Sequence, residues 1–193
     1  MPKTLDIIHR EHQALAAVLQ ALRFVVDGLA AGRFEPDFKL LASMLDYVAE
    51  MPEVLHHPKE EAFLHRRLRE KCPETVPALD RLVEEHRNSP EGVRRLAEAL
   101  VHYQARGAEG LPRFEAAARE FVASNFEHMN REEKDIMPLA RKSLDAADWA
   151  EIDAEFERNA DPYKGEAGRF EELFHQIVNL VPAPMGLGPA GKG

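Results

Sequence analysis

Two short strings in this sequence each pair a histidine with a glutamate four residues later. The first is His56-His57-Pro58-Lys59-Glu60-Glu61, and the second is His128-Met129-Asn130-Arg131-Glu132-Glu133. On an α-helix, residues four apart lie on one face, about one turn from each other. Imidazole and carboxylate groups on the inward faces of packed helices are the ligands with which helical bundles bind metal ions. The repeated string therefore predicts a metal site inside a bundle.

Each string is preceded, at a similar distance, by a further histidine on an apolar helix face. His12 lies 44 residues before His56, and His86 lies 42 residues before His128. This spacing predicts a repeated helix pair, with a single histidine on the first helix and the His-x-x-x-Glu string on the second. Two such pairs close into a four-helix bundle with pseudo-twofold symmetry, which brings four histidines and two glutamates to one level.

Glu60 and Glu132 fall on faces that are otherwise apolar, where no lysine or arginine neutralises them. A single histidine or a single His-x-x-x-Glu pair would more often be a buried histidine or a surface pair. Six such groups at matched spacing favour a metal, because otherwise they would be buried together without partners. Mixed imidazole and carboxylate ligands suit Fe, Mn or Zn, and the one cysteine, Cys72, argues against iron–sulfur clusters and Cys-rich zinc sites.

The first string allows two registers, His56–Glu60 and His57–Glu61. Alignment of the two strings at His128 favours His56–Glu60. Pro58 lies inside this string and disturbs regular helix, so His57–Glu61 stays open as the alternative and His57 remains a further candidate ligand.

The remaining pattern predicts the helices that position these residues. Apolar residues recur at steps of three and four over residues 4–29, 37–71, 77–103 and 113–139, and no segment shows sustained strand alternation. We expect Thr4 to cap the first helix, and distortions near Pro52, Pro58 and Pro90.

The predicted fold is all-α: an up-down-up-down four-helix bundle over residues 1–145. Residues 146–193 are predicted to form a short helical extension and a Pro/Gly-rich tail packed on the bundle, with a turn at 159–165. In the tail, Val181, Met185 and Leu187 indicate that its first half packs against the helices.

Composition narrows the class of function. The chain has 193 residues, 45% of them hydrophobic, which suits one domain with a substantial core. A net charge of −9 argues against a nucleic-acid partner. No signal peptide, membrane-length apolar run, catalytic Ser-His-Asp pattern or phosphate-binding loop is evident, so we expect a cytoplasmic protein with no membrane partner that is not a classical enzyme.

Several of these motifs together resemble the bacterial hemerythrin-like (HHE cation-binding) domains over about residues 4–142. They are Glu11-His12, the His56 to Glu61 string, Glu85-His86, and the His128 to Glu133 string followed by Pro138. The segments Asp148-Trp149 and Ile177-Val178-Asn179-Leu180 are similar to a subset of that family with a C-terminal extension.

The resemblance implies a non-haem di-iron site, with two Fe ions bridged by carboxylate or oxo groups and Zn or Mn as substitutes. Carried over residue by residue, the implied metal ligands are His12, His56, Glu60, His86, His128 and Glu132. The oxygen-carrying hemerythrins instead use five His, one Glu and one Asp. The resemblance therefore favours response to O2, NO or peroxide, including stress response, or iron handling, over reversible oxygen carriage. A metal-dependent regulatory module without turnover is the alternative.

Overall fold

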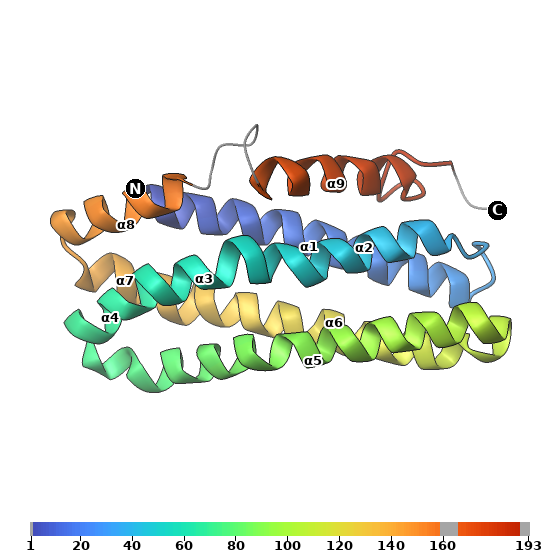
Figure 1. Ribbon diagram of the computed structural model, residues 1–193, viewed down its shortest axis with the longest axis horizontal. Coiled ribbons are helices and arrows are strands. Elements are labelled where there is room, and N and C mark those ends of the chain that lie inside the picture. Colours follow the sequence, from blue (N-terminus) through green and yellow to red (C-terminus); the bar gives the residue numbers. More distant parts are fainter. Residues whose placement is uncertain (1, 159–165, 190–193) are drawn as a thin grey trace.

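The computed structural model describes residues 2–158 and 166–189, and these form a bundle of long helices with two shorter helices beside it (Figure 1). The first long helix is α1 (Lys3–Ala30). The second comprises α2 (Phe38–Met51), η1 (Pro52–His56), α3 (His57–Lys59), η2 (Glu60–His65) and α4 (Arg66–Lys71). The third comprises η3 (Pro73–Thr75) and α5 (Val76–Arg106), and η4 (Gly107–Glu109) follows it. The fourth comprises α6 (Leu111–Arg131), η5 (Glu132–Ile136) and α7 (Met137–Ser143).

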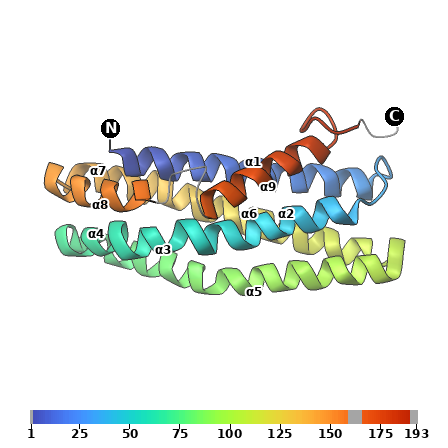
Figure 2. The ribbon, with the colours of Figure 1, turned by 45° about the horizontal axis from the view of Figure 1, so that its top comes forward.

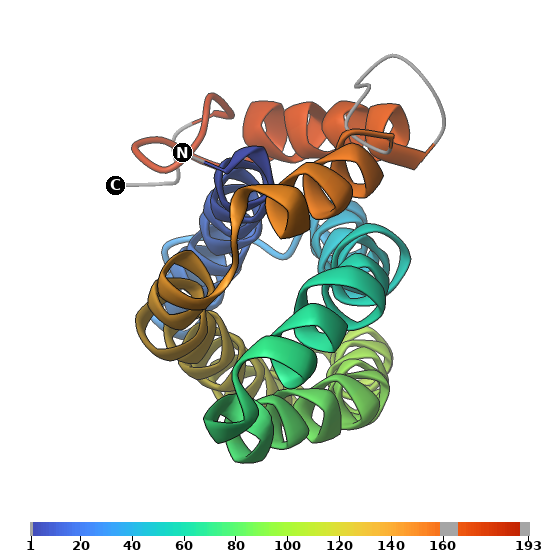
Figure 3. The same cartoon turned by 90° about the vertical axis from the view of Figure 1, so that its left-hand side faces the viewer.

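The predicted all-α bundle is confirmed. The four long helices run alongside one another (Figure 2), and seen from one end they surround a common centre (Figure 3). The extension consists of α8 (Ala146–Arg158) and α9 (Glu166–Leu180). Both lie on the side of the bundle formed by α1 and α2, whereas α5 and α6 form the opposite side (Figures 1 and 3).

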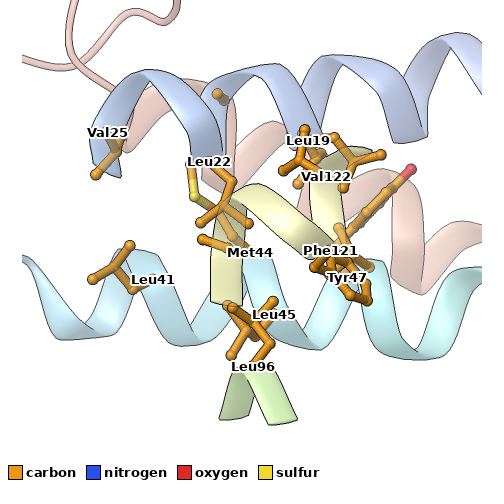
Figure 4. Close-up of a cluster of buried hydrophobic side chains, with 14 of the residues drawn as sticks. Leu19, Leu22, Val25, Leu41, Met44, Leu45, Tyr47, Leu96, Phe121 and Val122 are labelled. Atoms are coloured by element: carbon orange, nitrogen blue, oxygen red, sulfur yellow. The ribbon is translucent and has the colours of Figure 1, made fainter. Parts of the chain in front are cut away.

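Two apolar clusters fill the bundle, and a polar layer separates them. One cluster joins residues such as Leu19, Leu22, Met44, Leu96 and Phe121 from α1, α2, α5 and α6, whose side chains point toward one another (Figure 4). The second cluster lies toward the other end and includes Ile8 of α1 and Leu82 of α5. Along these two helices the histidines follow Ile8 and Leu82, so they enter the bundle between the two clusters.

The expected distortions in the second helix take the form of π-helical turns rather than breaks. One π-turn, η1, begins at Pro52, and another, η2, begins just after Pro58. The fourth helix has the same feature at η5, which ends two residues before Pro138. A π-turn adds a residue to one turn of helix and is frequent at functional sites. It also removes the need for the hydrogen bond that a proline cannot donate.

Two local details differ from expectation. The third helix does not unwind at Pro90, since α5 is continuous from Val76 to Arg106 and has buried leucines on both sides of the proline; a kink there stays a prediction. Thr4 is not a helix cap, since it lies inside the first turn of α1. The cap comes instead from α8, where Asp153 Oδ1 accepts hydrogen bonds from Thr4 N at 2.8 Å and Thr4 Oγ1 at 2.7 Å.

The extension packs on the bundle through aromatic contacts, and only part of the tail is buried. The Tyr47 ring of α2 lies 6.1 Å from the Phe170 ring of α9. Val181 is buried, whereas Met185 and Leu187 are 42% and 77% exposed, so these two do not pack as expected. The turn expected at 159–165 lies outside the described residues. Helix α1 has the length and composition of a membrane span, as do many core helices, and half of its most apolar window is buried in the bundle.

Candidate metal centre

All six residues singled out by their spacing meet in the polar layer. His12 comes from α1, His56 from η1, Glu60 from η2, His86 from α5, His128 from α6 and Glu132 from η5. Five of them are buried to at least 95%, and His128 is partly buried. Each element supplies its residue from the inward face of a long helix, so the site draws on all four helices of the bundle.

The first half of the site consists of His12 and His56. Their Nε2 atoms lie 2.9 Å apart, and their rings cross at 61°. His12 Nε2 is 3.1 Å from Glu132 Oε2, and His56 Nε2 is 3.4 Å from Glu60 Oε1. Nitrogen and oxygen atoms held about 2.1 Å from a shared ion lie roughly 3 to 4 Å from one another. These four groups therefore have the spacing that one cation requires.

The second half consists of His86 and His128, whose rings cross at 69°. His86 Nε2 lies 3.9 Å from Glu60 Oε2 and 3.8 Å from Glu132 Oε1. His128 Nε2 lies 3.6 Å from the same Glu132 oxygen. Each glutamate thus presents one oxygen to each half of the site. A cation held in either half would therefore be within reach of both Glu60 and Glu132.

The buried polar atoms fit bound cations. Glu60 Oε2, His86 Nε2, His128 Nε2 and both Glu132 oxygens are buried and have no hydrogen-bond partner among the described residues. Such atoms are costly in a protein interior unless something compensates them. Burial and repulsion from Glu132 raise the pKa of Glu60 well above its usual range. Burial opposes ionisation of Glu132 as well, but the imidazoles of His12 and His86 outweigh it and hold its pKa well below the usual range.

The outward nitrogen of each of the four histidines donates to a carboxylate. The Nδ1–oxygen distances are 3.0 Å for His12–Glu133, 2.8 Å for His56–Glu11, 2.7 Å for His86–Glu61 and 2.9 Å for His128–Glu85. An ionised carboxylate only accepts, so the proton lies on Nδ1 and Nε2 keeps its lone pair for the centre of the bundle. In metal-binding histidines, the ring nitrogen that does not bind the metal almost always donates such a hydrogen bond.

A basic residue, three positions after the histidine of each string, holds the outer carboxylate. Lys59 Nζ donates to Glu11 Oε1 at 2.8 Å, and a nitrogen of the Arg131 guanidinium donates to Glu85 Oε1 at 2.6 Å. Burial opposes ionisation of Glu11, but His56 and Lys59 lower its pKa. Both halves of the bundle therefore repeat the same contacts, as the pseudo-twofold symmetry predicts.

His57 also lies in the polar layer, although the structure gives it a different role from His56. One of its nitrogens lies within 4.8 Å of nitrogens of His86 and His128. Its ring stacks on His86 at 3.8 Å with an interplanar angle of 11°. Glu61, its partner in the alternative register, faces His86 Nδ1 on the outer side of the layer. The inward pair in the first string is thus His56 and Glu60.

Sequence reasoning missed two groups of residues around the site. The outer carboxylates and the cations that hold them have a signal in the sequence, since each lone histidine follows a glutamate and each string contains a basic residue at the same place. His65 gives no such signal. It is 2% exposed, its ring lies 6.0 Å from that of His86, and burial lowers its pKa to about 3.

The fold and the site together define a helical bundle with buried His and Glu clusters suited to a metal. Residues 3–140 match the family model described as the Hemerythrin HHE cation binding domain, and the chain belongs to that family. No curated protein and no solved structure shows a significant match to this chain.

Proposed function

We propose that this protein is a non-haem di-iron protein that binds, senses or reduces a small ligand such as O2, NO or peroxide. The observation that carries the proposal is the placement of Glu60 and Glu132, each with one oxygen toward His12 or His56 and the other toward His86 or His128. A set of four imidazoles and two carboxylates would suit iron, with Mn and Zn as competing metals.

The residues of this chain would hold the ions and shield them. Two iron ions would supply one-electron redox chemistry and coordination positions for a small ligand. The Nδ1–carboxylate contacts orient the four imidazoles before metal arrives, which lowers the cost of binding. The apolar clusters on either side, represented by Ile8 and Leu15 before and after His12 on α1, limit the entry of water along the bundle axis.

Metal analysis together with absorption spectroscopy of the purified protein tests this proposal. We expect about two Fe per chain after anaerobic loading with Fe(II), and a near-ultraviolet band after oxidation that changes on addition of azide. Glu132→Ala should lose both ions, because this carboxylate faces both halves. Glu120→Ala, at an exposed position on α6, is the control and should bind as the wild type does. A protein that takes up no iron under these conditions would contradict the proposal.

The alternative is a metal-dependent regulatory module, and one contact favours it. Phe156 of α8 packs over Lys59 Nζ at 5.1 Å, and Lys59 holds the carboxylate that supports His56. The extension is therefore connected to the first half of the site by three consecutive contacts. Equal protease sensitivity of α8 with and without metal would count against this role.

A further inference from the structure

The two halves of the site repeat the same residues but differ in what covers them. On the first half, Lys59 is 4% exposed and the ring of Phe156 from α8 lies over it. The extension lies on that side of the bundle, over α1 and α2 (Figure 3). On the second half the matching cation, Arg131, is 19% exposed in its side chain and lines a pocket between α5 and α6.

This pocket reaches the polar layer. Its volume is about 280 Å³, and three imidazoles, those of His57, His86 and His128, form part of its wall. Gly92 and Phe121 also line the pocket, and the glycine leaves this part of the α5 wall without a side chain. The wall includes atoms of the second half of the site, whereas His12 and His56 are not among its lining residues.

We infer that a small ligand reaches the site through the α5–α6 pocket, at the half formed by His86 and His128, and that His57 contacts the ligand there without being a metal ligand. The inference rests on the proposed function, because it assigns an entry side and a contact residue to the same centre. It makes the two ion positions unequal, although their nearest residues match.

The shape and charge of the pocket indicate the class of ligand. A space of 280 Å³ that opens between two helices lies near the lower end of the range for ligand pockets and has room for a small molecule. Its wall carries Arg81, Arg95 and Arg131 against Glu85 and Glu127, in a chain of net charge −9. Arg131 Nε is buried and has no hydrogen-bond partner among the described residues. A small molecule that is uncharged or carries one negative charge fits this environment.

The orientation of His57 distinguishes it from the four histidines assigned to the ions. Two imidazoles on one ion radiate from it, and each ring plane contains the ion, so the rings cannot stack face to face. His12 with His56 and His86 with His128 cross at 61° and 69°, but His57 is parallel to His86 at 3.8 Å. Glu53 Oε1 lies 3.3 Å from His57 Nδ1, which leaves Nε2 for a ligand.

The second string has Met129 at the position where the first has His57. The difference between the two halves of the site is therefore also present in the sequence. Met129 is buried in the apolar cluster of the bundle. The first string thus sends an imidazole into the pocket on the α5–α6 side, and the second string sends no second imidazole toward the α1–α2 side. Of the two residues that directly follow the string histidines, His57 can form a hydrogen bond and lines the pocket, whereas Met129 is apolar and buried.

Gly92 offers a matched pair of variants for testing the entry side. A Cβ at this position would lie 3.5 Å from the Phe121 ring, which is ordinary contact, so Gly92→Ala should leave the pocket open. Gly92→Leu places a branched side chain beside the Phe121 ring and should narrow the pocket. With azide as the probe and the oxidised, iron-loaded protein, we expect Gly92→Leu to slow binding at least tenfold in stopped-flow absorption, with unchanged iron content. Equal rates for Gly92→Leu, Gly92→Ala and wild type would overturn the entry side.

His57→Leu tests the contact residue. We expect two Fe per chain to be retained, and the azide dissociation constant to rise at least fivefold because the hydrogen bond is lost. Retention of only one Fe would overturn the assignment, since His57 would then be a metal ligand. Unchanged azide affinity at full iron content would overturn it as well. Failure of the wild type to take up iron would instead contradict the proposed function, so the two failures are distinguishable.

Discussion

Buried Lys59 and partly buried Glu11 form an ion pair on the outer side of His56. Lys59 Nζ donates to one carboxylate oxygen at 2.8 Å, and the other oxygen accepts from His56 Nδ1 at 2.8 Å. Lys59 is 4% exposed, so this is one of the few fully enclosed cations in the described chain. The charge of Glu11 is thereby fixed, and with it the tautomer of the histidine.

Lys59→Met should destabilise the protein, because it leaves the partly buried Glu11 carboxylate without its cation. Removal of one partner of a buried pair costs about 3 kcal/mol. Chemical denaturation of the metal-free protein measures this loss. The double variant Lys59→Met with Glu11→Gln should recover part of it, whereas Lys3→Met, at an exposed lysine, should change stability little. Additive effects of the two buried substitutions would show that the pair is not coupled.

Glu85→Gln should weaken metal binding without removing a ligand. The Glu85 carboxylate accepts hydrogen bonds from His128 Nδ1 at 2.9 Å and from Arg131 at 2.6 Å. Glutamine at this position lacks the negative charge that orients the imidazole. Loss of such an outer partner typically costs about 10- to 100-fold in metal affinity. Competition with a chelator gives the affinity. The neighbouring Glu84 is exposed, and Glu84→Gln should bind as the wild type does. Identical affinities for both variants would contradict the prediction.

Glu60→Gln should lower metal affinity without lowering the stability of the metal-free protein. Burial and repulsion from Glu132 raise the pKa of Glu60, so its charge is unfavourable in the metal-free protein. Glutamine has the shape of the protonated acid and carries no charge. We therefore expect the metal-free variant to be as stable as the wild type, or more stable by about 1 kcal/mol. Its metal affinity should fall at least tenfold. Equal loss of stability and affinity would indicate a structural role instead.

His65 should make the metal-free protein sensitive to acid. Burial lowers its folded pKa from 6.5 to about 3, so below pH 6.5 the unfolded chain binds the proton first. Stability contributed by the neutral ring is present above pH 6.5 and is lost as the pH falls toward 3. At pH 5 the loss is about 2 kcal/mol. In urea titrations at pH 7 and pH 5, His65→Phe should show a smaller difference between the two pH values than the wild type. An equal difference would refute the prediction.

Asp153→Ala should loosen the start of α1 and the docking of α8. The Asp153 carboxylate accepts from Thr4 N and Oγ1, so it supplies across the fold the cap that α1 lacks locally. Loss of a cap costs about 1 kcal/mol. Asp153→Asn keeps an acceptor oxygen and should lose less. Hydrogen exchange at the amides of the first turn of α1 would report the change, and unaltered exchange in Asp153→Ala would count against it.

The sequence by itself determined the bundle and the six residues at its centre. Helical periodicity places His12, Glu60 and Glu132 on inward faces, and the 44- and 42-residue spacings align the two halves. These signals are local, because a helix repeats its face every three to four residues whatever its neighbours are. The outcome at Pro90 was not predictable this way, since packing on either side maintained the helix.

Only the tertiary structure decided which residues support the site and on which side a pocket lies next to it. The contacts of Glu11 with Lys59, of Asp153 with Thr4 and of Phe156 with Lys59 join elements far apart in the chain. The π-turns shift the register after Pro52 and Pro58, which fixes His56 and Glu60 inward and turns His57 toward the pocket. Such relationships depend on helix packing and local hydrogen bonding, and the spacing of residues along one helix does not encode them.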